Sequence, residues 1–97
     1  MFGTLGRAKV NPGDREKLIE ILRRQSYETS VEGFIGAKVL LPKERDDEVW
    51  LAAWFTDEDS YYRNADDPKQ HERWQEYSAL FQGDAEWTDG EWRDMGE

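Results

Sequence analysis

One side chain in this chain of 97 residues is suited to acid–base catalysis near neutral pH. His71 is the single histidine, and imidazole is the side chain whose ordinary pKa lies closest to neutrality. It could therefore act as a general base that takes a proton from a bound substrate. The alternative is a structural histidine, hydrogen-bonded at the edge of a helix. Its spacing puts His71 on the same helical side as Trp74 and Ser78.

Aromatic side chains are the second chemical resource of the sequence. The chain has five Trp, four Tyr and four Phe, and such rings either fill a small core or line a pocket for a flat ligand. Trp50 and Trp54 alternate with the small Ala52 on one side of an apolar segment. This pattern allows an aromatic-walled cavity, and plain core packing is the alternative.

Other kinds of chemistry lack their sequence motifs. The segment HERWQ at His71 has no second histidine for a zinc helix, and DEDSYY from Asp57 lacks the later ligand and the glycine of a calcium loop. No glycine-rich phosphate loop is present, and the absence of cysteine excludes thiolate and iron–sulfur chemistry. We therefore predict no metal site and no cofactor.

The charge of the chain argues against two classes of partner. Thirteen basic and 22 acidic residues give a net charge of -9, which opposes binding to nucleic acid and to anionic membranes. No apolar run approaches the ~18–20 residues of a membrane-spanning helix, and the N-terminal residues lack the pattern of a secretory signal. The absence of cysteine suits the cytoplasm, which we predict as the location.

These residues must be positioned by a small α+β fold. The length predicts one domain over residues 1–97, and the periodicity predicts the order β-α-β-β-α-β. The expected elements are strand 2–10, a helix from 11 to about 26–30, strands 34–41 and 49–55, helical segments 56–65 and 67–83, and a last strand that begins near Gly90. Thr56 and Asp67 are the expected caps of the two helical segments. A C-terminal hairpin, with Trp87 in its first arm, is the alternative to one strand.

Both faces of the predicted sheet are apolar. Trp50, Ala52 and Trp54 point to one side, whereas Val49, Leu51, Ala53 and Phe55 point to the other. The chain has helices enough to cover one face only, so we expect a second copy to cover the other and predict a homodimer. We assign the tryptophan face to the helices and the Val49 face to the dimer interface.

The same element order occurs in RNA-recognition modules. Those modules need stacking aromatic residues within a basic-glycine-aromatic signature on the third strand. Here that strand reads VWLAAWF and the chain is acidic, so we exclude RNA binding.

Three segments carry a resemblance to a known family. GFIGAKVLL, EVWLAAWFTDEDSYYRNADD and KQHERWQEY resemble the antibiotic biosynthesis monooxygenases, whose members often show a Gly-Phe entry to strand two, a Trp near the end of strand three and a His in the following helix. The resemblance implies a ferredoxin-like protomer that pairs into a dimeric α+β barrel, with a pocket between sheet and helices. The family includes cofactor-independent quinol-forming oxygenases, haem-degrading enzymes and members without known activity.

The resemblance also implies roles for individual residues. Trp54 matches the strand-three Trp and His71 matches the helical His. The candidate catalytic residues are His71 as base, Tyr61 as an alternative base and Arg7 as a partner for a developing phenolate. The candidate substrate-binding residues are Trp50, Trp54, Tyr62 and Trp74.

Two departures from the family narrow the choice of activity. Trp50 stands where some of the oxygenases have Asn, and Gly6 stands where the haem-degrading branch has Asn before its strand-one Arg. The haem-degrading activity therefore fits less well, although His71 could serve as an axial ligand. We expect a cofactor-independent monooxygenase that uses O₂ on a small aromatic, phenolic substrate of polyketide or quinol type. A non-catalytic ligand-binding or accessory dimer is the alternative. A hydrophobic cavity open to solvent, with His71 reaching into it, would favour the enzyme, and a filled core with His71 bonded to backbone would favour the alternative. We expect Trp54 and His71 to line one cavity.

Overall fold

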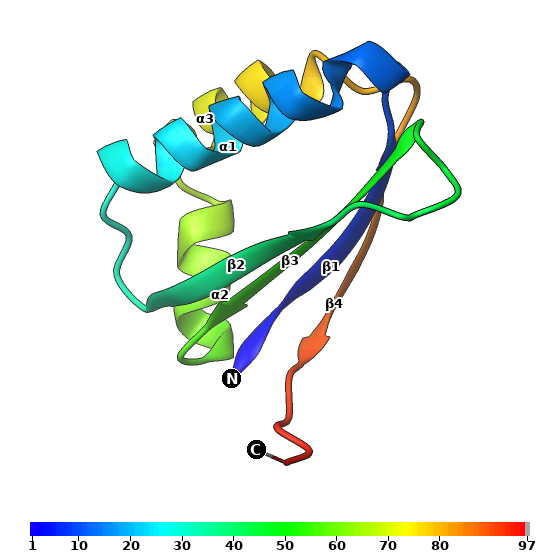
Figure 1. Cartoon of the computed structure of the whole chain (residues 1–97). Coiled ribbons are helices and arrows are strands. Elements are labelled where there is room, and N and C mark those ends of the chain that lie inside the picture. The colour runs from blue at the N-terminus through cyan, green and yellow to red at the C-terminus, as the bar shows by residue number, and fades with distance from the viewer. Residues whose placement is uncertain (97) are drawn as a thin grey trace.

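The computed structural model describes residues 1–96, which form one antiparallel sheet and a layer of helices (Figure 1). The elements are β1 (Phe2–Lys9), the 3-10 turn η1 (Pro12–Asp14), α1 (Arg15–Glu28), β2 (Phe34–Leu40), β3 (Glu48–Phe55), α2 (Glu58–Ala65), α3 (Pro68–Ser78) and β4 (Glu86–Glu91). The four strands lie in the order β2-β3-β1-β4, and every neighbouring pair is antiparallel. The predicted β-α-β-β-α-β order, with its second helical segment broken in two, is confirmed as a ferredoxin-like α+β fold.

The helix starts follow local capping chemistry. The Asp67 side chain accepts a hydrogen bond from the Lys69 N–H at 2.9 Å, and Pro68 occupies the first turn of α3, as predicted. The α2 cap is Asp57, not Thr56, because the Asp57 carboxylate accepts the Ser60 N–H at 2.8 Å. Ahead of α1 the chain makes the turn η1, so the α-helix proper begins three residues later than Pro12 suggested.

The C-terminus forms one strand, as expected, but the strand lies earlier than predicted. Asp89 and Gly90 belong to β4 and make no hairpin turn, because both pair with β1. Trp92 lies just after the strand and its N–H donates to the Met1 carbonyl oxygen at 2.8 Å. The preceding helix ends at Ser78, and Gly83 takes a positive φ of 81° in the turn that leads to β4.

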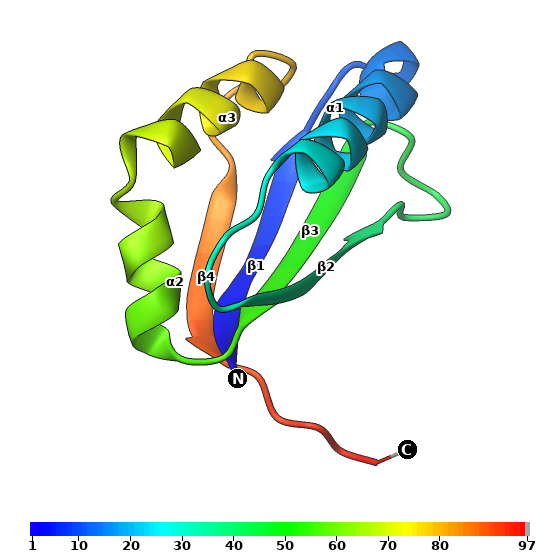
Figure 2. The ribbon, with the colours of Figure 1, turned by 90° about the vertical axis from the view of Figure 1, so that its left-hand side faces the viewer.

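All three helices lie over the same face of the sheet. Helices α1 and α3 run alongside each other above the strands, while α2 stands at one end of the sheet (Figures 1 and 2). The buried core forms where α1 and α3 meet the sheet, from Val10, Leu18, Val49 and Tyr77. Within residues 1–96, no helix has both the length and the apolar composition needed to cross a membrane.

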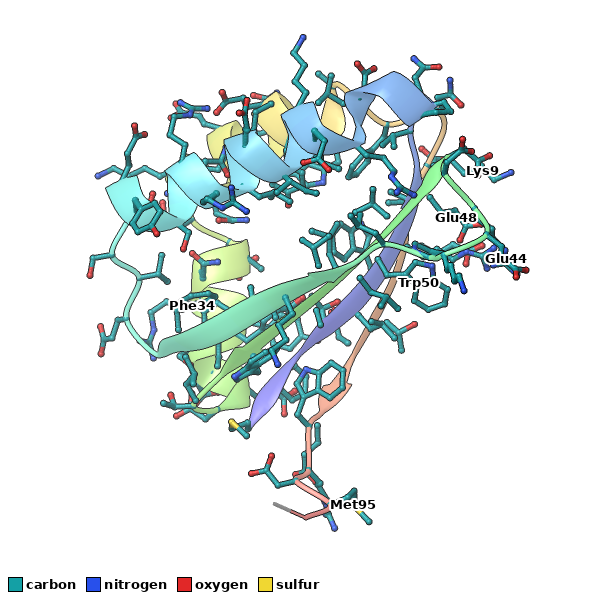
Figure 3. All side chains as sticks on the ribbon, in the orientation of Figure 1. Lys9, Phe34, Glu44, Glu48, Trp50 and Met95 are labelled. Carbon is teal, nitrogen blue, oxygen red and sulfur yellow. The ribbon has the colours of Figure 1, made fainter. Side chains whose placement is uncertain are left out.

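The two faces of β3 are the reverse of our assignment. Val49 is fully buried under the helices and Leu51 packs against the same core, whereas Trp50 lies on the side of the sheet away from the helices (Figure 3). The reason lies in the cross-strand neighbours. Residues of the Val49 set pair with uncharged residues such as Ala8 and Val39, but in the tryptophan set Trp50 lies opposite Arg7 and Ala52 lies opposite Lys38. A helix layer can cover the first set without burying a charge.

Candidate functional site

A cavity of about 880 Å³, open to solvent, lies between the sheet and the three helices. Its floor is the helix-facing side of β2 and β3, where Val39, Leu51, Ala53 and Phe55 contribute. The walls come from all three helices and from β4, and they include Tyr61, Asn64, His71, Arg73, Trp74 and Trp87. A space of this size is within the range of small-molecule sites.

His71 lies in the cavity wall contributed by α3. Its imidazole stacks on the Trp74 indole, with ring centroids 5.8 Å apart and an interplanar angle of 23°. The i,i+3 spacing on one helix produces this contact directly. His71 is solvent-exposed and Trp74 is 39% exposed. The pair therefore offers a flat surface and a titratable nitrogen at the same place.

Two phenols from α2 share one carboxylate on β4. The Tyr61 hydroxyl donates to one oxygen of Asp89 at 2.8 Å, and the Tyr62 hydroxyl donates to the other at 3.2 Å. The Phe2 ring packs against both, at centroid distances of 5.4 and 5.6 Å. Burial and the bond to Asp89 raise the pKa of Tyr61 to about 12. This phenol stays protonated at neutral pH, so Tyr61 is a wall residue and a poor base.

Trp87 forms a wall of the cavity that the sequence analysis did not assign. It pairs with Gly6 across β1 and β4, and its indole lies over that glycine. A Cβ at Gly6 would come within 2.4 Å of the ring, so only glycine leaves room for it. The signal in the sequence was a Trp on the last strand, but its relation to Gly6 depends on the register of β4.

Arg73 is held in the cavity wall by neutral side chains. Its Nε donates to the Gln70 amide oxygen at 3.0 Å, and Nη2 donates to the Asn64 amide oxygen at 3.3 Å. From α1, the Gln25 amide donates to the Arg73 carbonyl oxygen at 3.1 Å. These contacts tie α1, α2 and α3 together at the cavity. None of the four residues was singled out from the sequence as a site residue.

Arg7 and Trp50 lie on the opposite side of the sheet, so assigning them to the pocket was wrong. Arg7 forms a two-point ion pair with Glu48, at 2.9 and 3.3 Å, and its guanidinium lies 5.4 Å from the centre of the Trp50 ring. The Trp50 indole also donates to Glu48, at 3.1 Å. Glu48 is buried, with 3% exposure. This cluster is a stabilising network on the outer face.

Trp54 is also outside the cavity. Its ring packs edge-on against Trp92 at a centroid distance of 6.5 Å, and it lies beside Gly36 on the outer face. Trp92 donates its indole N–H to the Ala53 carbonyl oxygen at 3.0 Å. The predicted cavity shared by Trp54 and His71 is therefore wrong, because the sheet separates the two side chains.

Of the seven residues proposed from the sequence, three meet in one cavity. They are Tyr61, His71 and Trp74. Tyr62 is next to them, but its hydroxyl points to Asp89 and it does not line the cavity. Among residues 1–96, no group of three or more His, Asp or Glu is arranged to hold a metal ion.

Comparison with solved structures gives the same fold. The monooxygenase ActVA-Orf6 of Streptomyces coelicolor, solved with nanaomycin D, superposes with a TM-score of 0.82 at 22% identity, over 99% of this chain and 90% of that one. SnoaB, a cofactor-independent oxygenase of Streptomyces nogalater, gives in a mutant form a TM-score of 0.77 at 20% identity, over 97% and 94%. A conserved protein of Methanosarcina mazei gives a TM-score of 0.78 at 17% identity, over 92% of this chain and 89% of that one.

These likenesses establish the architecture and leave the activity to the site, because none of the three exceeds 22% identity. No curated protein matches the chain by sequence. The family model described as "Antibiotic biosynthesis monooxygenase" matches residues 1–80, which covers all three helices and three of the four strands. The chain therefore belongs to the antibiotic biosynthesis monooxygenase family.

Proposed function

We propose that this protein is a cofactor-independent monooxygenase that acts on a small aromatic, phenolic substrate in the cavity between sheet and helices. The observation that carries the proposal is the position of His71 in the wall of an open, aromatic-lined cavity. A flat substrate can stack on the surface that His71 and Trp74 form, or on the Trp87 indole across the cavity. Membership of a family of monooxygenases supports the same reaction.

The proposed chemistry needs a base beside a bound substrate. His71 takes a proton from the activated C–H or O–H of the substrate, and the resulting anion gives one electron to O₂. The radical pair combines to a peroxide, which loses water. For a methylene substrate the balance is R₂CH₂ + O₂ → R₂C=O + H₂O. The substrate supplies all the electrons, so the protein provides the binding site and the base.

His71 is assigned as the base because Tyr61 is unsuited to that role. A phenol with a pKa of about 12 is protonated at neutral pH, and its hydroxyl is committed to Asp89. Imidazole is the side-chain group most often used for general-base catalysis near neutral pH. Arg7, the partner suggested for a developing phenolate, is not available to the cavity because it pairs with Glu48 on the outer face.

The test is oxygen uptake with a panel of hydroxy-anthrones, followed together with absorbance. We expect His71→Gln to lower the rate by roughly 10²–10⁴-fold while ligand binding is retained. Gln75→Ala is the matched control, since Gln75 is exposed on the same helix and does not line the cavity. Equal rates for His71→Gln and the wild type would reject His71 as the base.

A ligand-binding role without turnover is the second candidate. The observation in its favour is that Asp89 accepts hydrogen bonds from the hydroxyls of both Tyr61 and Tyr62. Neither phenol is then available as a second acid–base group to assist His71 in a reaction. In that case the hydroxy-anthrones would bind and no oxygen would be consumed at a rate above that of the buffer.

We also propose that the protein is a homodimer through the outer face of its sheet. This face presents Trp50, Trp54 and Trp92, together with Leu40, which is 62% exposed in the protomer. An apolar face of this kind is usually covered by a partner. Leu51, which the sequence analysis placed in the interface, does not belong to it, because Leu51 faces the cavity.

Light scattering tests the dimer. We expect twice the protomer mass of 11.4 kDa for the wild type, and the protomer mass for Leu40→Asp. The control is Tyr27→Asp, because Tyr27 is 86% exposed on α1 and far from the outer face. A wild type that runs as a monomer at tens of micromolar would remove the proposal.

A further inference from the structure

The lining of the cavity contains no acidic residue, although the chain is rich in them. Asp and Glu account for 22 of the 97 residues, so a lining of this extent drawn at random would include several. Basic residues are not excluded in the same way, since Arg23 and Arg73 both line the cavity. The cavity of an acidic protein is thus biased toward positive charge.

Arg73 is the cation best placed to use this bias. It is only partly exposed, and its guanidinium is oriented by the amide oxygens of Gln70 and Asn64. No carboxylate within residues 1–96 lies within 4.0 Å of it, whereas Arg7, Arg24 and Arg45 each form an ion pair. Neutral amide partners fix the guanidinium fork but do not neutralise its charge, and N–H donors remain available.

The charge of Arg73 also acts on Tyr77, a buried residue of the cavity wall. Tyr77 lines the cavity, and burial raises its pKa to about 12, while the Arg73 guanidinium acts in the opposite direction. A cation in such a setting attracts an anion more strongly than one in bulk water does. An arginine fork matches the two oxygens of a carboxylate.

We propose that the cavity takes an aromatic ligand that carries a carboxylate, and that Arg73 binds this carboxylate. The inference rests on the proposed function and deepens it, because it names the substrate class of the same cavity. The aromatic part of the ligand lies against the surface that His71 and Trp74 form on α3. Gln70, which accepts a hydrogen bond from the Arg73 guanidinium, lies one residue before His71 and four residues before Trp74 on the same helix. Arg73 is then a specificity-determining residue that holds the substrate while His71 removes the proton.

The test compares two ligands of nearly the same shape by isothermal titration calorimetry. Naphthoate is anionic at about pH 7.5 and naphthamide is neutral, and neither has a phenol. We expect naphthoate to bind the wild type at least about tenfold more tightly, as a charge-assisted contact would give. Arg73→Gln should abolish this preference and leave naphthamide binding unchanged. The control Lys17→Gln removes a cation on α1 outside the lining and should keep the preference.

The outcomes separate this inference from the function on which it rests. Equal affinities for naphthoate and naphthamide in the wild type would overturn the inference alone. Failure of naphthoate, naphthamide and naphthol to bind would overturn both, since the aromatic site itself would be absent. If Arg73→Gln does not fold, Arg73→Lys takes its place. Lysine keeps the positive charge but lacks the planar guanidinium, so we expect a smaller preference for naphthoate over naphthamide. An unchanged preference would show that Arg73 does not hold the carboxylate.

Discussion

Three glycines of the sheet differ only in what a side chain at each would meet, and they provide a graded test of the structure. A Cβ at Gly90 meets no atom within 4 Å. At Gly6 it would lie 2.4 Å from the Trp87 ring, and at Gly3 it would lie 1.8 Å from the Ala53 carbonyl oxygen. None of the three has a positive φ, so the alanine variants differ in packing and not in backbone strain.

The expected stabilities follow from these contacts. Gly90→Ala should raise the free energy of unfolding by about 0.4–1 kcal/mol, because alanine has less conformational freedom than glycine in the unfolded chain. Gly6→Ala gains the same amount but forces the Trp87 indole aside, which costs about 1–3 kcal/mol as overpacking. The net loss, between about 0 and about 2.6 kcal/mol, lowers the Tm by up to about 20 °C in a domain of this size. Gly3→Ala meets backbone and must separate β1 from β3, so we expect no cooperative unfolding.

Thermal melts followed by circular dichroism measure the stability of the three variants, and titration with naphthol measures ligand binding in the cavity. Gly6→Ala should also weaken naphthol binding, because the displaced Trp87 no longer forms its wall. Gly90→Ala is the control for both readouts. If Gly6→Ala melts together with Gly90→Ala and binds naphthol normally, Trp87 does not lie over β1 and the register of β4 is wrong.

Two pH titrations follow from the ionisable groups. Burial and Asp89 raise the pKa of Tyr61 to about 12, above its ordinary value of 10.0, so stability should be complete below pH 10 and fall as the pH rises toward 12. Absorbance at alkaline pH should show late phenols from Tyr61 and Tyr77, and Tyr61→Phe should lower the amplitude of this late phase by one phenol. The hydrogen bond from Arg7 holds the pKa of Glu48 below its ordinary value of 4.5, so its stabilisation is present above pH 4.5 and is lost as the pH falls through the lowered pKa. Urea midpoints should therefore fall less between pH 6 and pH 3 in Glu48→Gln than in the wild type, and an equal fall would contradict the ion pair.

The order of elements was predictable because the signals for it are local. Alternation marks β2 and β3, and the Asp67-Pro68 pair caps α3 through bonds that span two residues. The errors at element ends have the same origin. Thr56 and Asp57 are both good caps in the sequence, and the choice between them depends on which side chain reaches the Ser60 N–H.

The faces of the sheet could not be predicted in the same way. Alternation divides β3 into two sets but does not say which set meets the helices, and tryptophan is as apolar as leucine in such a count. The decision depends on cross-strand pairing. Arg7 lies opposite Trp50, whereas the uncharged Gly6 lies opposite Leu51. Helices over the tryptophan face would therefore have buried the charge of Arg7. Only the register of β1 against β3 contains that information.

The same reasoning explains which site residues were found. His71 and Trp74 meet because they are three residues apart on one helix, so spacing alone was sufficient. Trp87 and Arg73 depend on long-range partners: the first on Gly6 across two strands, the second on Asn64 in the preceding helix. The positive bias of the cavity is a long-range property too, since it arises from where the fold sends the acids and not from any local motif. A chain whose overall charge would repel an anion can still bind one, provided that the carboxylates lie outside the wall and one arginine in it is held by amides.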